Sequence, residues 1–156
     1  MIWTLEIARQ FLPSTTLVTD AELRRYMHEV EACYIRPWLG RDAYWLLEEY
    51  SKGDPRPDWL AAIDMALAEL VQALAALNST RLTRFSAVKK TDPHSYSPTG
   101  EDAASEALRR RHIARKEVAE WVRSVRDGSL VVPADLKAVT RVPLGMDAGI
   151  LGEFRL

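Results

Sequence analysis

The side chains that could act in catalysis or bind a metal are few and lie far apart in this 156-residue chain. Its histidines, His28, His94 and His112, fall in different segments, and none has a second histidine four residues away, as a helical zinc motif requires. Asp92 and Ser95 stand beside His94, but this polar stretch lacks the G-x-S-x-G pattern that presents a nucleophilic serine. The sequence therefore predicts no metal site, no cofactor and no nucleophilic catalysis.

The other candidates for chemistry lie within predicted helices. Cys33 is part of an apolar helical stretch, which favours a position in the core over a role as nucleophile. As the only cysteine, it cannot form a disulfide within the chain, which favours a reducing compartment. Asp64 and Glu69 are five residues apart and do not share a helical face, so we expect them at a solvated helix edge. These patterns favour a protein that is not an enzyme.

Positive charge is densest in one predicted helix, in the arginines Arg109, Arg110, Arg111 and Arg115. Three glutamates, Glu106, Glu117 and Glu120, stand close enough to neutralise them, which favours a solvated helix face. The alternative is contact with phosphates or with an acidic partner, which would make the chain a small helical nucleic-acid-binding module. The net charge of -1 gives no overall attraction to nucleic acid or to membranes.

The elements that must position these side chains are organised around residues 58–79. Six apolar residues, spaced three or four apart, share one helical face in this stretch: Leu60, Ile63, Leu67, Leu70, Leu74 and Leu77. The stretch is about as long as a membrane span, but Asp64, Glu69 and Gln72 would each be costly in hydrocarbon. We therefore expect the core helix of a soluble, cytoplasmic, all-α domain, with an end near Ser79.

Other predicted helices surround this central one and cover residues 3–12, 20–36, 43–52 and 101–127. Thr19 and Glu22 have the spacing of a capping box at the start of the second helix. Pro37 disfavours a helical conformation at the residue before it, so that helix should end near Arg36. Gly128 should end the last helix. The sequence predicts a small helical bundle around a central Ala/Leu-rich helix.

Two segments have no helical period. Residues 80–100 form a long polar loop, which carries Lys89, Lys90, His94 and Tyr96. The sequence predicts two parts of the chain: a helical domain over residues 1–133 and an extended C-terminal tail over residues 134–156. The tail carries spaced apolar side chains: Val142, Leu144, Ile150, Leu151, Phe154 and Leu156. Because such a tail cannot bury itself, we expect it to dock either on its own domain or on a neighbouring subunit.

The order of features over residues 19–133 is similar to that of a known group of structural proteins. A capped helix ends in Tyr34-Ile-Arg-Pro-Trp-Leu-Gly40 and is followed by a short helix and a Pro-rich step. The Ala/Leu-rich helix, the polar loop and a long helix ending in Ala119-Glu-Trp-Val-Arg-Ser-Val-Arg-Asp-Gly128-Ser-Leu-Val-Val-Pro133 complete the order. This arrangement resembles the small helical head–tail connector (adaptor) proteins of tailed bacteriophages and prophages.

The resemblance implies a structural role in the virion neck, with the host cytoplasm as the site of assembly. Such proteins form a ring of about twelve copies under the portal, extend the DNA channel and dock the tail. The implied partners are the portal protein, a tail or stopper protein, other copies of the chain and double-stranded DNA, which passes without sequence-specific binding. In this setting Lys89, Lys90, His94 and Tyr96 would face the channel or an adjacent ring, and the C-terminal tail would bind a neighbouring chain.

Overall fold

A computed structural model describes residues 1–14, 16, 18–85 and 100–141, with the side chains of residues 79–85 and 100–102 left out. Within these ranges all regular secondary structure is helical, which confirms the all-α class. The elements are α1 (Leu5–Phe11), α2 (Asp20–Val30), the π-helix η1 (Glu31–Ile35), α3 (Arg36–Leu39), α4 (Arg41–Tyr50), the short 3₁₀ helix η2 (Asp58–Leu60), α5 (Ala61–Phe85), α6 (Gly100–Asp127) and α7 (Ala134–Val139).

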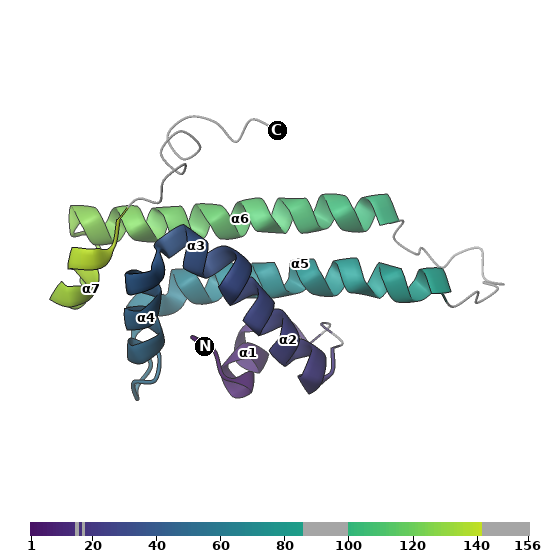
Figure 1. Ribbon diagram of the computed structural model, residues 1–156, viewed down its shortest axis with the longest axis horizontal. Coiled ribbons are helices and arrows are strands. Elements are labelled where there is room, and N and C mark those ends of the chain that lie inside the picture. Colours follow the sequence, from purple (N-terminus) through teal and green to yellow (C-terminus); the bar gives the residue numbers. More distant parts are fainter. Residues whose placement is uncertain (15, 17, 86–99, 142–156) are drawn as a thin grey trace.

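The long helices α5 and α6 form a hairpin that runs the length of the molecule (Figure 1). The helices α1 to α4 and α7 gather around one half of this hairpin, while its other half extends beyond them (Figure 1). The predicted central helix is therefore confirmed, although it continues past Ser79 to Phe85. Because α5 and α6 pack mainly on each other in the extended half, each of them leaves part of its surface uncovered there.

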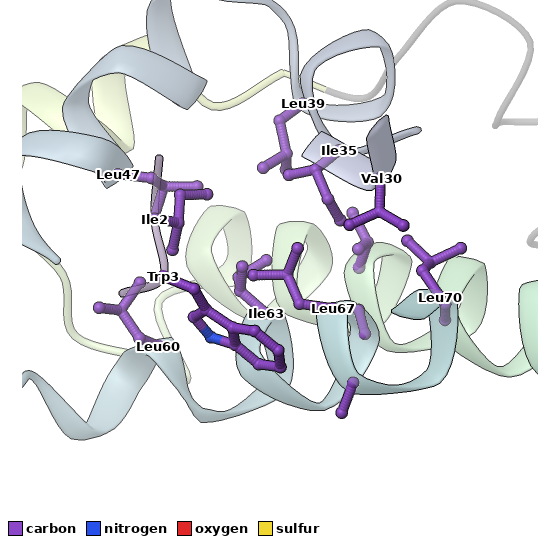
Figure 2. Packing of buried hydrophobic residues seen from close by; sticks show 14 of the residues in the cluster. Ile2, Trp3, Val30, Ile35, Leu39, Leu47, Leu60, Ile63, Leu67 and Leu70 are labelled. Carbon is purple, nitrogen blue, oxygen red and sulfur yellow. The ribbon is translucent and has the colours of Figure 1, made fainter. Parts of the chain in front are cut away.

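The core is built on the predicted apolar face of the central helix, of which Leu60 lies in η2 and the other residues lie in α5. Leu60, Ile63, Leu67 and Leu70 are buried, and they pack with side chains from the N-terminal segment and from η1 and α3 (Figure 2). Helix α6 adds buried apolar residues to the same cluster: Ala114, Val118, Trp121, Val122 and Val125. The last two leucines of the predicted face, Leu74 and Leu77, are only half-buried, because they lie in the extended half of the hairpin.

The start of α2 confirms the capping box. The Thr19 hydroxyl accepts a hydrogen bond from the Glu22 backbone N–H, and the Glu22 carboxylate accepts one from the Thr19 N–H at 2.8 Å. The bond from the Thr19 N–H and a second one from the Thr19 hydroxyl to the same carboxylate lower the pKa of the Glu22 carboxyl, with the backbone bond contributing most. The capping box satisfies backbone donors that the first turn of a helix otherwise leaves without partners.

The predicted end of this helix near Arg36 is wrong. The chain stays helical through η1 and then α3, and it turns only at Gly40, which has a φ of 84°. Pro37 lies in the first turn of α3, directly after the π-helix. The wider turns of the π-helix separate α2 from α3 and redirect the side chains between them.

The C-terminal part of the described chain also differs from the prediction. Residues 134–139, predicted as the start of an extended tail, form α7, and Leu136 is fully buried in the core. Asp135 near the start of α7 accepts a hydrogen bond from the Tyr50 hydroxyl at 2.9 Å, which ties α7 to α4. A helix of six residues is too short to show a clear period in sequence. Residues 142–156 lie outside the described part of the chain.

Candidate assembly surface

The basic cluster on α6 is largely neutralised by carboxylates of the same molecule. Arg109 donates two hydrogen bonds of 2.8 Å to Glu106, which lower the pKa of the Glu106 carboxyl. Arg110 contacts the same Glu106 and also Glu69 of α5, each at 2.8 Å. The pairing between Arg110 and Glu69 links the two helices of the hairpin, with both side chains about three-quarters covered.

Arg111 and Arg115 also have interactions within the chain. The Arg111 guanidinium lies over the ring of Tyr34, 5.0 Å from its centroid, and so joins α6 to η1. Arg115 is half-buried on α6 and has an interaction partner as well. The four predicted arginines thus lie on one helix, as expected, but three of them stabilise the fold of the chain itself. This arrangement favours the interpretation as a helix face neutralised by nearby glutamates.

An apolar hollow opens beside this cluster, between η1, α5 and α6. It has a volume of about 320 Å³, and we call it the hairpin groove. It is lined by Tyr34, Leu70, Ala73, Leu74, Leu77, Ala104, Ala107, Leu108 and Arg111. The alanines fill less space than the leucines around them, which leaves room between the two helices. The groove combines an apolar lining with one charged and one aromatic side chain that are stacked on each other.

Two large apolar side chains of the hairpin helices are exposed. Leu108, which lines the groove, is 44% exposed, and Met65 on α5 is 51% exposed. The stretch Asp58–Asn78 has a mean hydropathy of 1.8 and is long and apolar enough to cross a membrane, yet only half of it is buried in its own fold. Core helices of soluble proteins reach such values when they are covered on all sides. Among the described side chains of α5, Ala61 and Met65 are exposed, and the others are buried or partly buried.

Asp64 is not at a solvated helix edge, as the sequence suggested, but inside the protein. Its side chain is 3% exposed, and its carboxylate accepts a 2.7 Å hydrogen bond from the Trp3 indole N–H. Arg56 pairs with both carboxylate oxygens and also donates to the backbone carbonyls of Ile2 and Ser51. This buried network holds the N-terminal segment and the linker before α5 against the same helix.

A second buried carboxylate, that of Glu31, also holds the N-terminal segment in place. It accepts hydrogen bonds from the Ile2 backbone N–H at 3.0 Å and from the Tyr44 hydroxyl at 2.6 Å. Burial, together with the Glu31 carboxylate, raises the pKa of the Tyr44 hydroxyl. Every buried side-chain nitrogen and oxygen among the described residues has a hydrogen-bond partner. The two carboxylates therefore act in the architecture of the fold.

Cys33 is exposed on η1, which corrects the prediction of a core position. The wider turn of the π-helix places Glu31 and Ile35 in the interior, so Cys33 between them faces outward. No group of three or more histidine, cysteine, aspartate or glutamate side chains that could hold a metal ion is found in residues 1–14, 18–78 and 103–141.

The remaining predicted contact residues cannot be placed. Lys89, Lys90, His94 and Tyr96 of the loop lie outside the described residues. The same holds for the apolar tail residues Val142, Leu144, Ile150, Leu151, Phe154 and Leu156. The hairpin groove was not predicted from sequence; the alanines at positions 73, 104 and 107 are its only visible signal, and that signal also fits close helix packing.

Comparison of the chain with protein-family models, with curated proteins and with solved structures found no match.

Proposed function

We propose that the chain is a structural subunit of a head–tail connector, which assembles with other copies into a ring under the portal of a tailed bacteriophage or prophage. The observation that supports this proposal most is the apolar hairpin groove, in which Leu108 is 44% exposed. Apolar patches of this kind, rimmed by polar residues, are typical of protein–protein contacts. The kind of assembly, a ring under the portal, is proposed from the resemblance of residues 19–133 to head–tail connector proteins.

The rim of this surface is also suited to contact with another protein. Arg110 and Glu69 pair beside the groove, and Arg111 stacks on Tyr34 within it. Arginine and tyrosine are enriched at the buried centres of interfaces, where each combines a large contact area with polar groups. In a nucleic-acid-binding module, the alternative interpretation of the cluster, phosphates would have to compete with the carboxylates that already pair with Arg109 and Arg110.

The test of this function is assembly with a portal. The purified full chain is mixed with the portal protein encoded in the same genome, and the complexes are separated by sedimentation and imaged by negative-stain electron microscopy. We expect rings of the chain on one face of the portal. If the folded chain neither sediments with the portal nor forms rings on it, the proposed function is wrong.

A truncated chain makes this experiment more specific. Residues 134–139 belong to the folded domain, since Leu136 is in the core, so the truncation should begin after Arg141 rather than after Pro133. We expect the chain ending at Arg141 to keep its helical circular dichroism and its melting temperature, but to lose its place on the portal. Normal incorporation of this truncated chain would contradict the role proposed for the tail.

A further inference from the structure

We infer that the hairpin groove binds helix α6 of a second copy of the chain, with the two α6 helices antiparallel and the contact centred between Ala104 and Leu108. This inference goes beyond the proposed function, because it concerns the chain before it meets a portal. The groove is lined by residues of α5 and α6 where the hairpin begins to extend past the other helices (Figure 1). A second long helix can therefore lie along it.

The first argument is the shape of the α6 face that lines the groove. Leu108 is 44% exposed, and Ala104, one turn before it on the same face, is a small exposed residue. A twofold axis midway between these two positions places Leu108 of each copy against Ala104 of the other. A large side chain thus meets a small one twice, which is how helices pack closely without voids.

The second argument is charge. The same axis places position 101, which holds a glutamate, next to Arg111 of the other copy, again twice. Positions 101, 104, 108 and 111 are spaced by three or four residues and so share one helical face. Arg111 lines the groove and is exposed. An antiparallel contact therefore joins opposite charges at both of its ends, whereas a parallel contact in register would bring like charges together.

The symmetry of this contact has a consequence for assembly. Both copies use the same surface, so the contact closes at two copies and cannot repeat around a ring. In the free chain the pair would cover the groove that supports the proposed ring, and assembly on a portal would have to separate the two copies. The pair would thus keep free chains from forming rings where no portal is present.

The test uses two charge reversals of the full chain, Glu101→Arg and Arg111→Glu, with native mass spectrometry at several concentrations. Each variant alone brings two like-charge contacts into its dimer, so we expect its dissociation constant to rise at least about tenfold. In an equimolar mixture, the dimer with one copy of each variant recovers both opposite-charge contacts, and its dissociation constant should match that of the natural dimer within about threefold. A natural chain without a dimer, variants that pair as well as it does, or a mixture without recovery would each overturn the inference.

Two controls separate this contact from other ways of pairing. Arg123 is another exposed arginine of α6, outside the groove lining. A mixture of Glu101→Arg with Arg123→Glu has the same net charges as the test mixture, but the register does not bring these two positions together, so the mixed dimer should not recover. Equal recovery in both mixtures would overturn the inference. The chain ending at Arg141 should pair as the full chain does, and a loss of pairing would show that the contact depends on the C-terminal segment instead.

A second measurement does not depend on Arg111, whose replacement also removes its contact with Tyr34. Ala104→Cys and Leu108→Cys are each combined with Cys33→Ser, since Cys33 is exposed. When the two variants are mixed and oxidised, we expect a disulfide between different variants. Little should form in either variant alone, because there the two cysteines stand about one helical turn apart along the axis. Equal cross-linking of each variant with itself would overturn the proposed register.

The result remains separable from that of the portal experiment. Rings on the portal, formed by a chain that is monomeric when free, would disprove the pair and leave the connector function standing. A pair with the expected register, in a chain that does not bind the portal, would have the opposite meaning.

Discussion

Replacing Arg56 with alanine should lower the free energy of unfolding by about 3–5 kcal/mol. The substitution leaves the Asp64 carboxylate buried, with only the Trp3 indole N–H as its partner. It also removes donors from the carbonyls of Ile2 and Ser51. An unpaired charge in the interior is far more unfavourable than a broken ion pair at the surface, because water cannot replace the lost partner. Urea denaturation, followed by circular dichroism at 222 nm, measures the change.

Two controls define this expectation. Arg9→Ala breaks an ion pair with Asp20 in which both side chains are well exposed, and it should change the free energy of unfolding by at most about 1 kcal/mol. The double variant Arg56→Met with Asp64→Leu removes both charges and should recover much of the stability lost in Arg56→Ala. If Arg56→Ala is no more destabilising than Arg9→Ala, Asp64 is not held as described.

Trp3→Ala should have an effect of similar size, a loss of about 3–5 kcal/mol. The Trp3 side chain is 1% exposed, lies against α5 near Ile63, and stacks on Phe11 with ring centroids 5.7 Å apart (Figure 2). Alanine would leave a cavity in the centre of the core and remove the indole donor from Asp64. The loss is measured by the same urea denaturation.

A matched control is the substitution of an exposed tryptophan. Trp45 on α4 is 55% exposed and stacks with Arg41, so Trp45→Ala should change the stability by about 1 kcal/mol or less. Trp3→Phe keeps most of the buried volume and should be clearly less destabilising than Trp3→Ala. Equal effects of Trp3→Ala and Trp45→Ala would show that the N-terminal segment is not part of the core.

The local features of the fold could be predicted from the sequence because local patterns determine them. The apolar spacing from Leu60 to Leu70 was sufficient to identify the core face of α5, and Thr19 with Glu22 to identify the start of α2. Gly128, with a φ of 83°, ends α6 as predicted, because a glycine adopts this conformation without a steric penalty.

Features that depend on distant partners could not be predicted in this way. Asp64 is buried because Trp3, 61 residues earlier in the chain, and Arg56 both reach it. The periodicity of α5 contains no information about either partner, so the exposed edge was the natural expectation for a carboxylate. The π-helix at Glu31–Ile35 is a similar case, because one additional residue in a turn changes which of the following side chains face the core.

The hairpin groove depends on how α5 and α6 lie against each other. Its lining comes from residues near 34, 70–77 and 104–111, and a hollow forms only where short side chains of both long helices come together. The alanines that produce it are also the residues that let helices pack closely, so the sequence alone did not distinguish the two outcomes.

The most direct test of the account is the native mass of the chain, because the central claim is that copies of the chain assemble through the hairpin groove. Native mass spectrometry over a range of concentrations should show multiples of the 17.7 kDa chain that grow with concentration. Leu108→Glu, which places a charge in the groove, should shift these species toward the monomer, whereas Val131→Glu, at an 84% exposed position away from the groove, should not. A natural chain that stays monomeric at every concentration would contradict the account.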